Sequence, residues 1–147
     1  MPIDRKHVGR TLPRAVLEVE AGRLRFFAKA IGESDPIYFE EPAALAAGYP
    51  SLPAPPTFIF AAMLDGGTMA RALFEMGVDV RRVLHGEQGF TYHAPICAGD
   101  TITVETRISD IYEKSGGALE FIALNSAASR QDGSLAAEMR ALLVVRH

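Results

Sequence analysis

The second half of this chain is dominated by a hydrophobic period of two. Hydrophobic and polar residues alternate over four runs, at residues 83–93, 100–113, 118–130 and 135–146. Side chains on a β-strand point alternately to its two faces, so each run predicts a strand with one buried face. Glycine-containing turns separate the runs, and short turns join strands that pair antiparallel. The sequence therefore predicts an antiparallel sheet, with a further early strand near residues 11–19.

The first half instead has the period of a helix. Residues 21–31 place four hydrophobic side chains at helical spacing, namely Leu24, Phe27, Ala28 and Ile31. Gly32 follows as a stop signal. A second, shorter helix is predicted over residues 40–47, with Pro42 tolerated in its first turn.

Residues 57–64 are almost wholly apolar and predict a helix that is buried on all sides. Four prolines within residues 50–56 make the connection into this helix extended and stiff. Gly66 and Gly67 weaken the helix, and helical spacing resumes over residues 69–76. The simplest packing wraps the antiparallel sheet around this long central helix, which gives an α+β fold in a single domain over residues 1–147.

Composition limits the classes of function. The net charge is −3, so nucleic acid is not an expected partner. A single cysteine, Cys97, fits a reducing cytoplasm, and the scattered histidines predict no metal site. Residues 1–7 carry no apolar run, so no signal peptide is expected there, and no segment is apolar and long enough to span a membrane.

Three stretches of the chain resemble the MaoC-like dehydratase family. They are FAKAIGESDPIYF at residues 27–39, AGYPSLPAPPTF at 47–58, and VLHGEQ at 83–88 with YHAPICAGD at 92–100. The resemblance implies a hot-dog fold and the (R)-specific hydration of 2-enoyl thioesters, or the reverse dehydration, in fatty acid metabolism. It further implies a CoA or acyl-carrier-protein thioester as substrate, two hot-dog subunits side by side, and no cofactor.

The first of these stretches departs from the family pattern at its acid and base. Catalytic members carry Asp-x-Asn-Pro-x-His, and here Glu33, Asp35 and Tyr38 stand at the Asp, Asn and His positions. A tyrosine with a pKa near 10 exchanges protons poorly at neutral pH, whereas a histidine does so readily. The three residues are candidate catalytic residues, but Asp35 before a proline is also typical of a turn and Tyr38 of packing.

The second stretch departs at the oxyanion donor. Where catalytic members have a glycine whose amide N–H faces the thioester oxygen, this chain has Pro56, which has no N–H. The third stretch is similar to the N-terminal, non-catalytic repeat of two-repeat hydratases, and the chain also resembles the substrate-binding subunits of heteromeric dehydratases. Both departures agree with that subclass. On that resemblance we expect an acyl-binding role for a set of residues, namely Pro56, Thr57, Phe58, His85 and Glu87. His85 and Glu87, two residues apart, are expected on one strand face, as pocket residues or as a structural hydrogen-bonded couple.

The expected function is therefore that of a subunit of an enoyl-thioester hydratase or 3-hydroxyacyl-thioester dehydratase. A partner subunit would supply the Asp/His pair that this chain lacks. Two alternatives stay open. One is a stand-alone hot-dog thioesterase that uses Asp65 of the central helix, or Glu87, as base or nucleophile. The other is an inert homodimer that binds acyl-CoA.

Overall fold

One curled antiparallel sheet forms most of the molecule. The structure, a computed structural model, describes residues 2–147, so Met1 of the segment considered for a signal peptide lies outside the described residues. The strands are β1 (Ala15–Glu18), β2 (Val83–Tyr92), β3 (Thr101–Lys114), β4 (Leu119–Ser129) and β5 (Leu135–Arg146). Their order in the sheet is β1-β3-β4-β5-β2, and every neighbouring pair is antiparallel. The predicted antiparallel sheet is confirmed.

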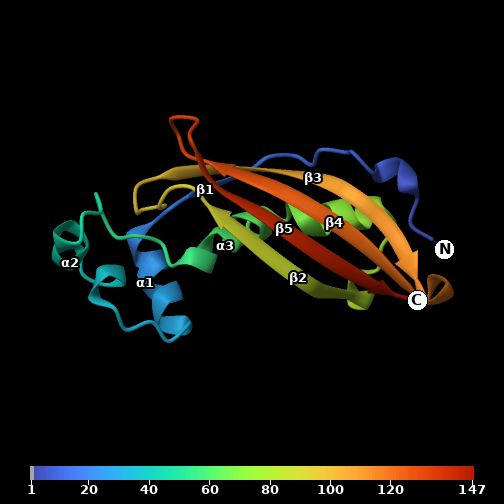
Figure 1. Cartoon of the computed structure of the whole chain (residues 1–147), viewed down its shortest axis with the longest axis horizontal. Coiled ribbons are helices and arrows are strands. Elements are labelled where there is room, and N and C mark those ends of the chain that lie inside the picture. The colour runs from blue at the N-terminus through green and yellow to red at the C-terminus, as the bar shows by residue number, and fades with distance from the viewer. Residues whose placement is uncertain (1) are drawn as a thin grey trace.

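Helical segments lie beneath the sheet and beyond one of its ends (Figure 1). The α-helices are α1 (Ala21–Ala30), α2 (Glu41–Ala46), α3 (Phe60–Leu64) and α4 (Thr68–Glu75). Short 3-10 turns are η1 (Arg5–His7), η2 (Pro36–Tyr38), η3 (Pro56–Ile59), η4 (Val80–Arg82) and η5 (Ser115–Gly117). The α1 and α2 helices lie beyond one end of the sheet, and the two chain ends of the structure lie at the other (Figure 1). The helices predicted over residues 21–31 and 40–47 correspond to α1 and α2.

The central helical segment differs from the prediction, because it is not one long helix. The η3 turn runs into α3, the chain breaks at residues 65–67, and α4 begins at Thr68. Gly67 has a φ of 69°, in the left-handed region that a right-handed helix cannot contain. The break falls at the pair of glycines where the sequence weakens the helix. The long helix is therefore corrected to two shorter ones that pack under different parts of the sheet.

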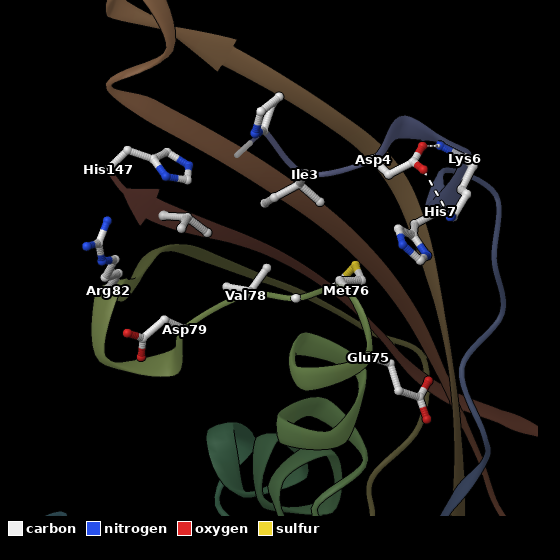
Figure 2. A pocket seen from close by; sticks show the side chains of 13 residues that line it. Ile3, Asp4, Lys6, His7, Glu75, Met76, Val78, Asp79, Arg82 and His147 are labelled. Atoms are coloured by element: carbon white, nitrogen blue, oxygen red, sulfur yellow. Dashed lines mark hydrogen bonds and ion pairs between the residues drawn. The ribbon is translucent and has the colours of Figure 1, made fainter.

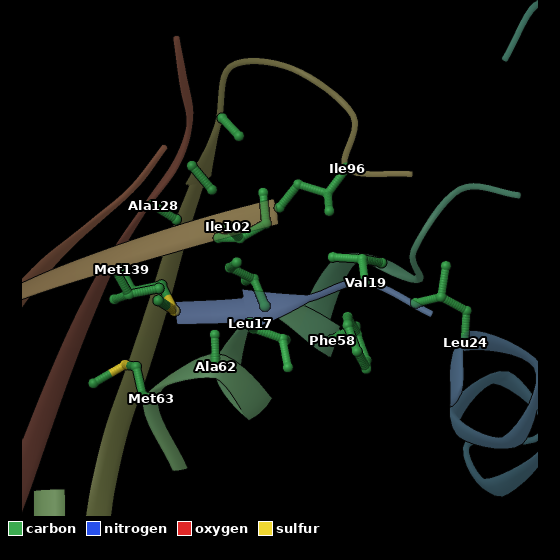
Figure 3. Close-up of a cluster of buried hydrophobic side chains, with 14 of the residues drawn as sticks. Leu17, Val19, Leu24, Phe58, Ala62, Met63, Ile96, Ile102, Ala128 and Met139 are labelled. Carbon is green, nitrogen blue, oxygen red and sulfur yellow. The ribbon is translucent and has the colours of Figure 1, made fainter. Parts of the chain in front are cut away.

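The core follows the alternation along the strands. Ile102, Val104 and Ile108 of β3 are each at most 1% exposed, and they share the concave face with alternate residues of β5. Figure 3 shows the part of the core in which Phe58, Ala62 and Met63 of the central segment meet the sheet. A second cluster packs Leu73 of α4 and neighbouring residues against the other half of the sheet. The sheet thus closes over α3 at one end and over α4 at the other.

Strand β2 forms one edge of the sheet and contains a β-bulge. His85 lies opposite Leu143 of β5, but Glu87 lies opposite Leu142, one register position out of step. Residues directly opposite one another share a face, so His85 points to the concave face and Glu87 to the other. The expected common face for these two residues is wrong, because the bulge inserts one extra residue between them. Gly86 fits there because a Cβ atom would lie 2.9 Å from Val144 Cγ2.

Across residues 2–147, none of the helices has both the length and the apolar composition that a membrane crossing requires.

Candidate functional site

A narrow cavity of about 180 Å³ lies at the end of the molecule that carries α1 and α2; we call it the slot. Its walls come from the loop after α1, the chain after α2, the proline-rich entry to η3, and the end of β2. Three tyrosines and four prolines dominate its lining, namely Tyr38, Tyr49, Tyr92, Pro53, Pro55, Pro56 and Pro95. Within the described part of the chain, no carboxylate, imidazole or amine side chain lines the slot. The slot is therefore an apolar site whose polar side-chain groups are phenols.

The loop after α1 places Tyr38 in the slot and keeps its two acids outside the lining. The Glu33 carboxylate accepts hydrogen bonds from the backbone N–H groups of Ser34 (3.1 Å) and Asp35 (3.4 Å). The Asp35 carboxylate accepts one from the N–H of Ile37 (3.1 Å) and so begins η2. Both carboxylates therefore organise the turn. Tyr38, at the end of η2, is the member of the candidate catalytic set that lines the slot.

Two of the phenols in the slot, those of Tyr38 and Tyr92, have a raised pKa. Partial burial raises the pKa of Tyr38, and the negative charge of Glu33 raises this pKa further. Burial likewise raises the pKa of Tyr92. A neutral phenol can donate a hydrogen bond to a carbonyl oxygen but is a poor base at pH 7. Tyr38 is thus suited to binding and not to activating water.

The proline-rich segment brings Pro56 into the same slot as Tyr38. Backbone hydrogen bonds pin this segment against residues 96–98, from Ala54 N to Ile96 O (2.7 Å) and from Ala98 N to Leu52 O (2.8 Å). Pro56 then opens η3 at the mouth of the central segment. Since proline has no amide hydrogen, the position offers no donor to a thioester oxygen. The two departures seen in the sequence meet in one cavity.

Thr57 and Phe58, both expected to bind substrate, lie outside the slot lining. The Phe58 side chain is 1% exposed and packs edge-on against Phe27, with ring centroids 5.4 Å apart. The Arg23 guanidinium lies over the same ring, 5.5 Å from its centroid. Phe58 therefore supports the slot from the core, and Thr57 is exposed.

Asp65 lies at the break after α3, on the surface and not inside a buried helix as expected. Its carboxylate forms a two-pronged ion pair with Arg23 of α1, with Arg23 Nη2 2.7 Å from Asp65 Oδ1. The hydrogen bond from Arg23 lowers the pKa of Asp65. An ionised carboxylate held in this way is occupied in fastening α1 to the central segment.

His85 and Glu87 are also outside the slot lining. The His85 ring meets Phe60 edge-on, with centroids 5.2 Å apart, on the concave face. Its Nε2 lies 3.0 Å from Gln88 Oε1 and 3.1 Å from the backbone oxygen of Glu87. His85 therefore forms local hydrogen bonds, but its partners are the Gln88 side chain and the backbone carbonyl of Glu87, not the Glu87 carboxylate. The Glu87 carboxylate lies on the opposite face of the sheet.

Tyr49, Tyr92 and Pro95 complete the slot, and none of them is among the site residues predicted from the sequence. Each of them lies within one of the three family-like stretches, and three of the four tyrosines of the chain do. Their clustering in those stretches was the available signal. In residues 2–147 no group of three or more His, Cys, Asp or Glu side chains could hold a metal ion.

Comparison with known proteins agrees with this architecture. The model of the family "FAS1-like, dehydratase domain region" matches residues 6–139. A UPF0336 protein of Thermobifida fusca is 37% identical over 99% of this chain and 95% of its own length. The structure of the HadBC (3R-hydroxyacyl-ACP dehydratase) complex of Mycobacterium tuberculosis superposes with a TM-score of 0.81, at 26% identity, over 94% of this chain and 96% of that one. A MaoC-like dehydratase superposes at 0.82 and 23% identity, over 95% of this chain and 42% of that one.

Since the matching family model spans nearly the whole chain, and the fold is shared with dehydratases of known structure, this protein belongs to the FAS1-like dehydratase-region family of MaoC-like hot-dog proteins.

Proposed function

We propose that this chain is the acyl-binding, non-catalytic subunit of an enoyl-thioester hydratase or 3-hydroxyacyl-thioester dehydratase. The single observation that carries the proposal is the meeting of Tyr38 and Pro56 in one slot. These residues stand at the positions of the family's base and oxyanion donor. The slot is still a cavity that can bind a ligand, but the base and the backbone hydrogen-bond donor are both replaced within it.

The chemistry of hydration explains why these replacements matter. Water must lose a proton to a base, the α-carbon must gain one from an acid, and the thioester oxygen must be stabilised as its negative charge grows. A protonated phenol and a proline nitrogen supply neither the base nor the backbone donor. Apolar walls with neutral hydroxyl groups do suit an acyl chain and the carbonyl of a CoA or acyl-carrier-protein thioester.

The edge strand supports a partner of the same fold. None of the ten residues of β2 is buried, and Leu84 and Tyr92 are 46% and 48% exposed. Leu64 and Phe74 of the central segment are 55% and 81% exposed. A long sheet edge that itself carries exposed apolar side chains is a surface that natural proteins cover. A second hot-dog subunit that carries the Asp/His pair would cover this edge and complete the active unit. The complex would act in the cytoplasm, in fatty acid metabolism.

The thioesterase alternative draws less support from the geometry. It requires a carboxylate free to attack a thioester or to activate water. Asp65 is engaged by Arg23 through two hydrogen bonds, and Glu87 lies on the face of the sheet away from the central helices.

Reconstitution with a catalytic subunit tests the proposal. The chain is co-expressed with hot-dog proteins encoded beside it that retain Asp-x-Asn-Pro-x-His, and the hydration of 2-enoyl thioesters by the complex is measured. We expect Tyr38→Phe in this chain to raise the KM of the complex by roughly tenfold, since one hydrogen bond to the substrate is lost. Tyr112→Phe is the matched control, because Tyr112 lies outside the slot and stacks on Phe121. An unchanged KM in the Tyr38 variant, or no complex with any such subunit, contradicts the proposal.

A further inference from the structure

A second cavity, of about 590 Å³, lies at the opposite end of the molecule from the slot; we call it the terminal cavity. The N-terminal segment forms one wall, and the connection from α4 to β2 forms the facing wall (Figure 2). The end of β5 closes it. A cavity of this size falls within the range of roughly 300–1,000 Å³ that is typical of small-molecule sites.

The floor of the terminal cavity is apolar and held in place by a buried acid. Ile3 faces Met76 and Val78 across it (Figure 2), and Ile3 and Val78 are 8% and 7% exposed. Both oxygens of the Glu120 carboxylate lie 2.9 Å from the backbone nitrogen of Ile3, which donates to them. Glu120 is itself only 4% exposed. The N-terminal wall is therefore fixed to the sheet by a charge-assisted hydrogen bond and does not merely lie over it.

The acidic groups around the terminal cavity already have cationic partners. Asp4 pairs with Lys6 at 3.0 Å, and Asp79 pairs with Arg81 at 2.8 Å. The hydrogen bonds from Arg81 lower the pKa of Asp79 to about 2, so this acid stays ionised and paired at neutral pH. Glu75 likewise contacts two arginines, of which Arg71 lies at 3.2 Å.

Arg82 is held less directly than Arg81. Within residues 2–147 its guanidinium forms no ion pair, in contrast to that of Arg81, although its charge helps to lower the pKa of Asp79. Figure 2 shows Arg82 at one end of the cavity together with His147, whose Nε2 lies 3.2 Å from Glu120 Oε2. An unpaired guanidinium beside an apolar floor is an arrangement that favours a ligand with one anionic group and an apolar body.

We propose that the terminal cavity is a binding site for a small amphipathic anion. The carboxylate or phosphate of the ligand would contact Arg82, and its apolar body would lie between Ile3 and Val78. The site is separate from the slot and needs no partner subunit, so it can be tested on the full chain alone.

The test compares three probes with the same alkyl tail by calorimetry and by NMR of the full chain: hexanoate, hexyl phosphate and uncharged hexanol. We expect at least one anion to bind and to shift the amide signals of Ile3 and Val78, with hexanol weaker by roughly tenfold, since it lacks the charge-assisted contact. The two anions distinguish a carboxylate site from a phosphate site.

Three variants, each checked for folding by circular dichroism, locate the site. Arg82→Gln should weaken anion binding by roughly tenfold, since a hydrogen bond to a charged group is lost. Arg146→Gln removes the same charge from the residue after Val145 but does not line the cavity, and it should change nothing. Tyr112→Phe, outside both cavities, should also leave binding intact. Equal binding of hexanol, full affinity in Arg82→Gln, loss in Tyr112→Phe, or no binding of either anion overturns the proposal.

Discussion

The slot and the terminal cavity lie at opposite ends of the sheet and are lined by opposite kinds of side chain. The slot has tyrosines and prolines and no charged group, whereas the terminal cavity is ringed by arginine, lysine, histidine and carboxylate side chains. The family resemblance assigns acid–base chemistry to the slot end, around the residue that is Tyr38 here. On the proposed function, the slot offers apolar walls to an acyl chain without an acid or a base in its lining, whereas the charged side chains gather at the other end of the sheet.

Loss of the aromatic support beneath the slot should have the largest effect. Phe58→Ala removes a ring that is 1% exposed and packed on Phe27, and we expect a loss of about 3–5 kcal/mol in unfolding free energy. Urea unfolding measures it. Phe74→Ala, on the other side of the helix break, removes a ring that is 81% exposed and should cost less than about 0.5 kcal/mol. Equal losses in the two variants would show that the slot end is not the better-packed one.

The corresponding test at the charged end is Glu120→Gln. The buried carboxylate holds the Ile3 backbone and contacts His147, and a neutral amide cannot accept on both of its atoms. We expect a loss of about 1–3 kcal/mol in unfolding free energy, with faster amide hydrogen exchange at Ile3. The exposed Glu113, altered to Gln, is the control. Unchanged exchange at Ile3 would mean that the N-terminal wall is not fastened by this group.

Strand β2 connects the two ends, and its bulge can be tested at glycine. Gly86→Ala forces a methyl group to within 2.9 Å of Val144 Cγ2 and 3.1 Å of Leu142 O, so we expect destabilisation by about 1–3 kcal/mol. Gly22→Ala in α1 meets nothing within 4 Å and should stabilise by about 0.5–1 kcal/mol. Thermal unfolding of both variants measures whether each change lowers or raises the stability. A Gly86→Ala variant more stable than the wild type would contradict the close packing of the bulge against β5.

The smallest effect is expected at the ion pair between α1 and the helix break. Asp65→Asn should cost less than about 1 kcal/mol, because the Arg23–Asp65 pair is exposed to solvent. Arg23 lowers the folded-state pKa of Asp65, so the stabilisation is complete above the unfolded pKa of about 3.9 and disappears as the pH falls through the folded value. Urea unfolding of both proteins from pH 7 to pH 3 should show the gap closing. A difference in unfolding free energy that grows as the pH falls would contradict a stabilising Arg23–Asp65 pair.

Much of the fold could be predicted from period alone. The alternation of Ile102, Val104 and Ile108 places them on one buried face, and all three are buried. The extents of α1 and of the long strands followed in the same way, because hydrophobic period reports directly which side of an element faces the core. The sequence also predicts a weak point at Gly66 and Gly67, although the local pattern does not show that Gly67 adopts a left-handed conformation.

Two features of the structure could not be predicted from the pattern of residues along the chain. The bulge at Gly86 reverses the face of Glu87, and a bulge depends on how β2 registers with β5, not on the sequence of β2 alone. The meeting of Tyr49 and Tyr92 with Tyr38 depends on how α2 packs near the end of an edge strand. The sequence contains only an indirect indication that these distant segments meet, namely that each tyrosine lies within a family-like stretch.

The most direct measurement of the central claim is the hydration of crotonyl-CoA and longer 2-enoyl-CoAs by the purified chain alone, followed as loss of the enoyl-thioester absorbance over a range of protein concentrations. We predict a rate no higher than that of buffer, because the slot offers Tyr38 in place of a base and Pro56 in place of a backbone donor. A rate that rises in proportion to the concentration of wild-type protein, and that disappears in Tyr38→Phe, would contradict it.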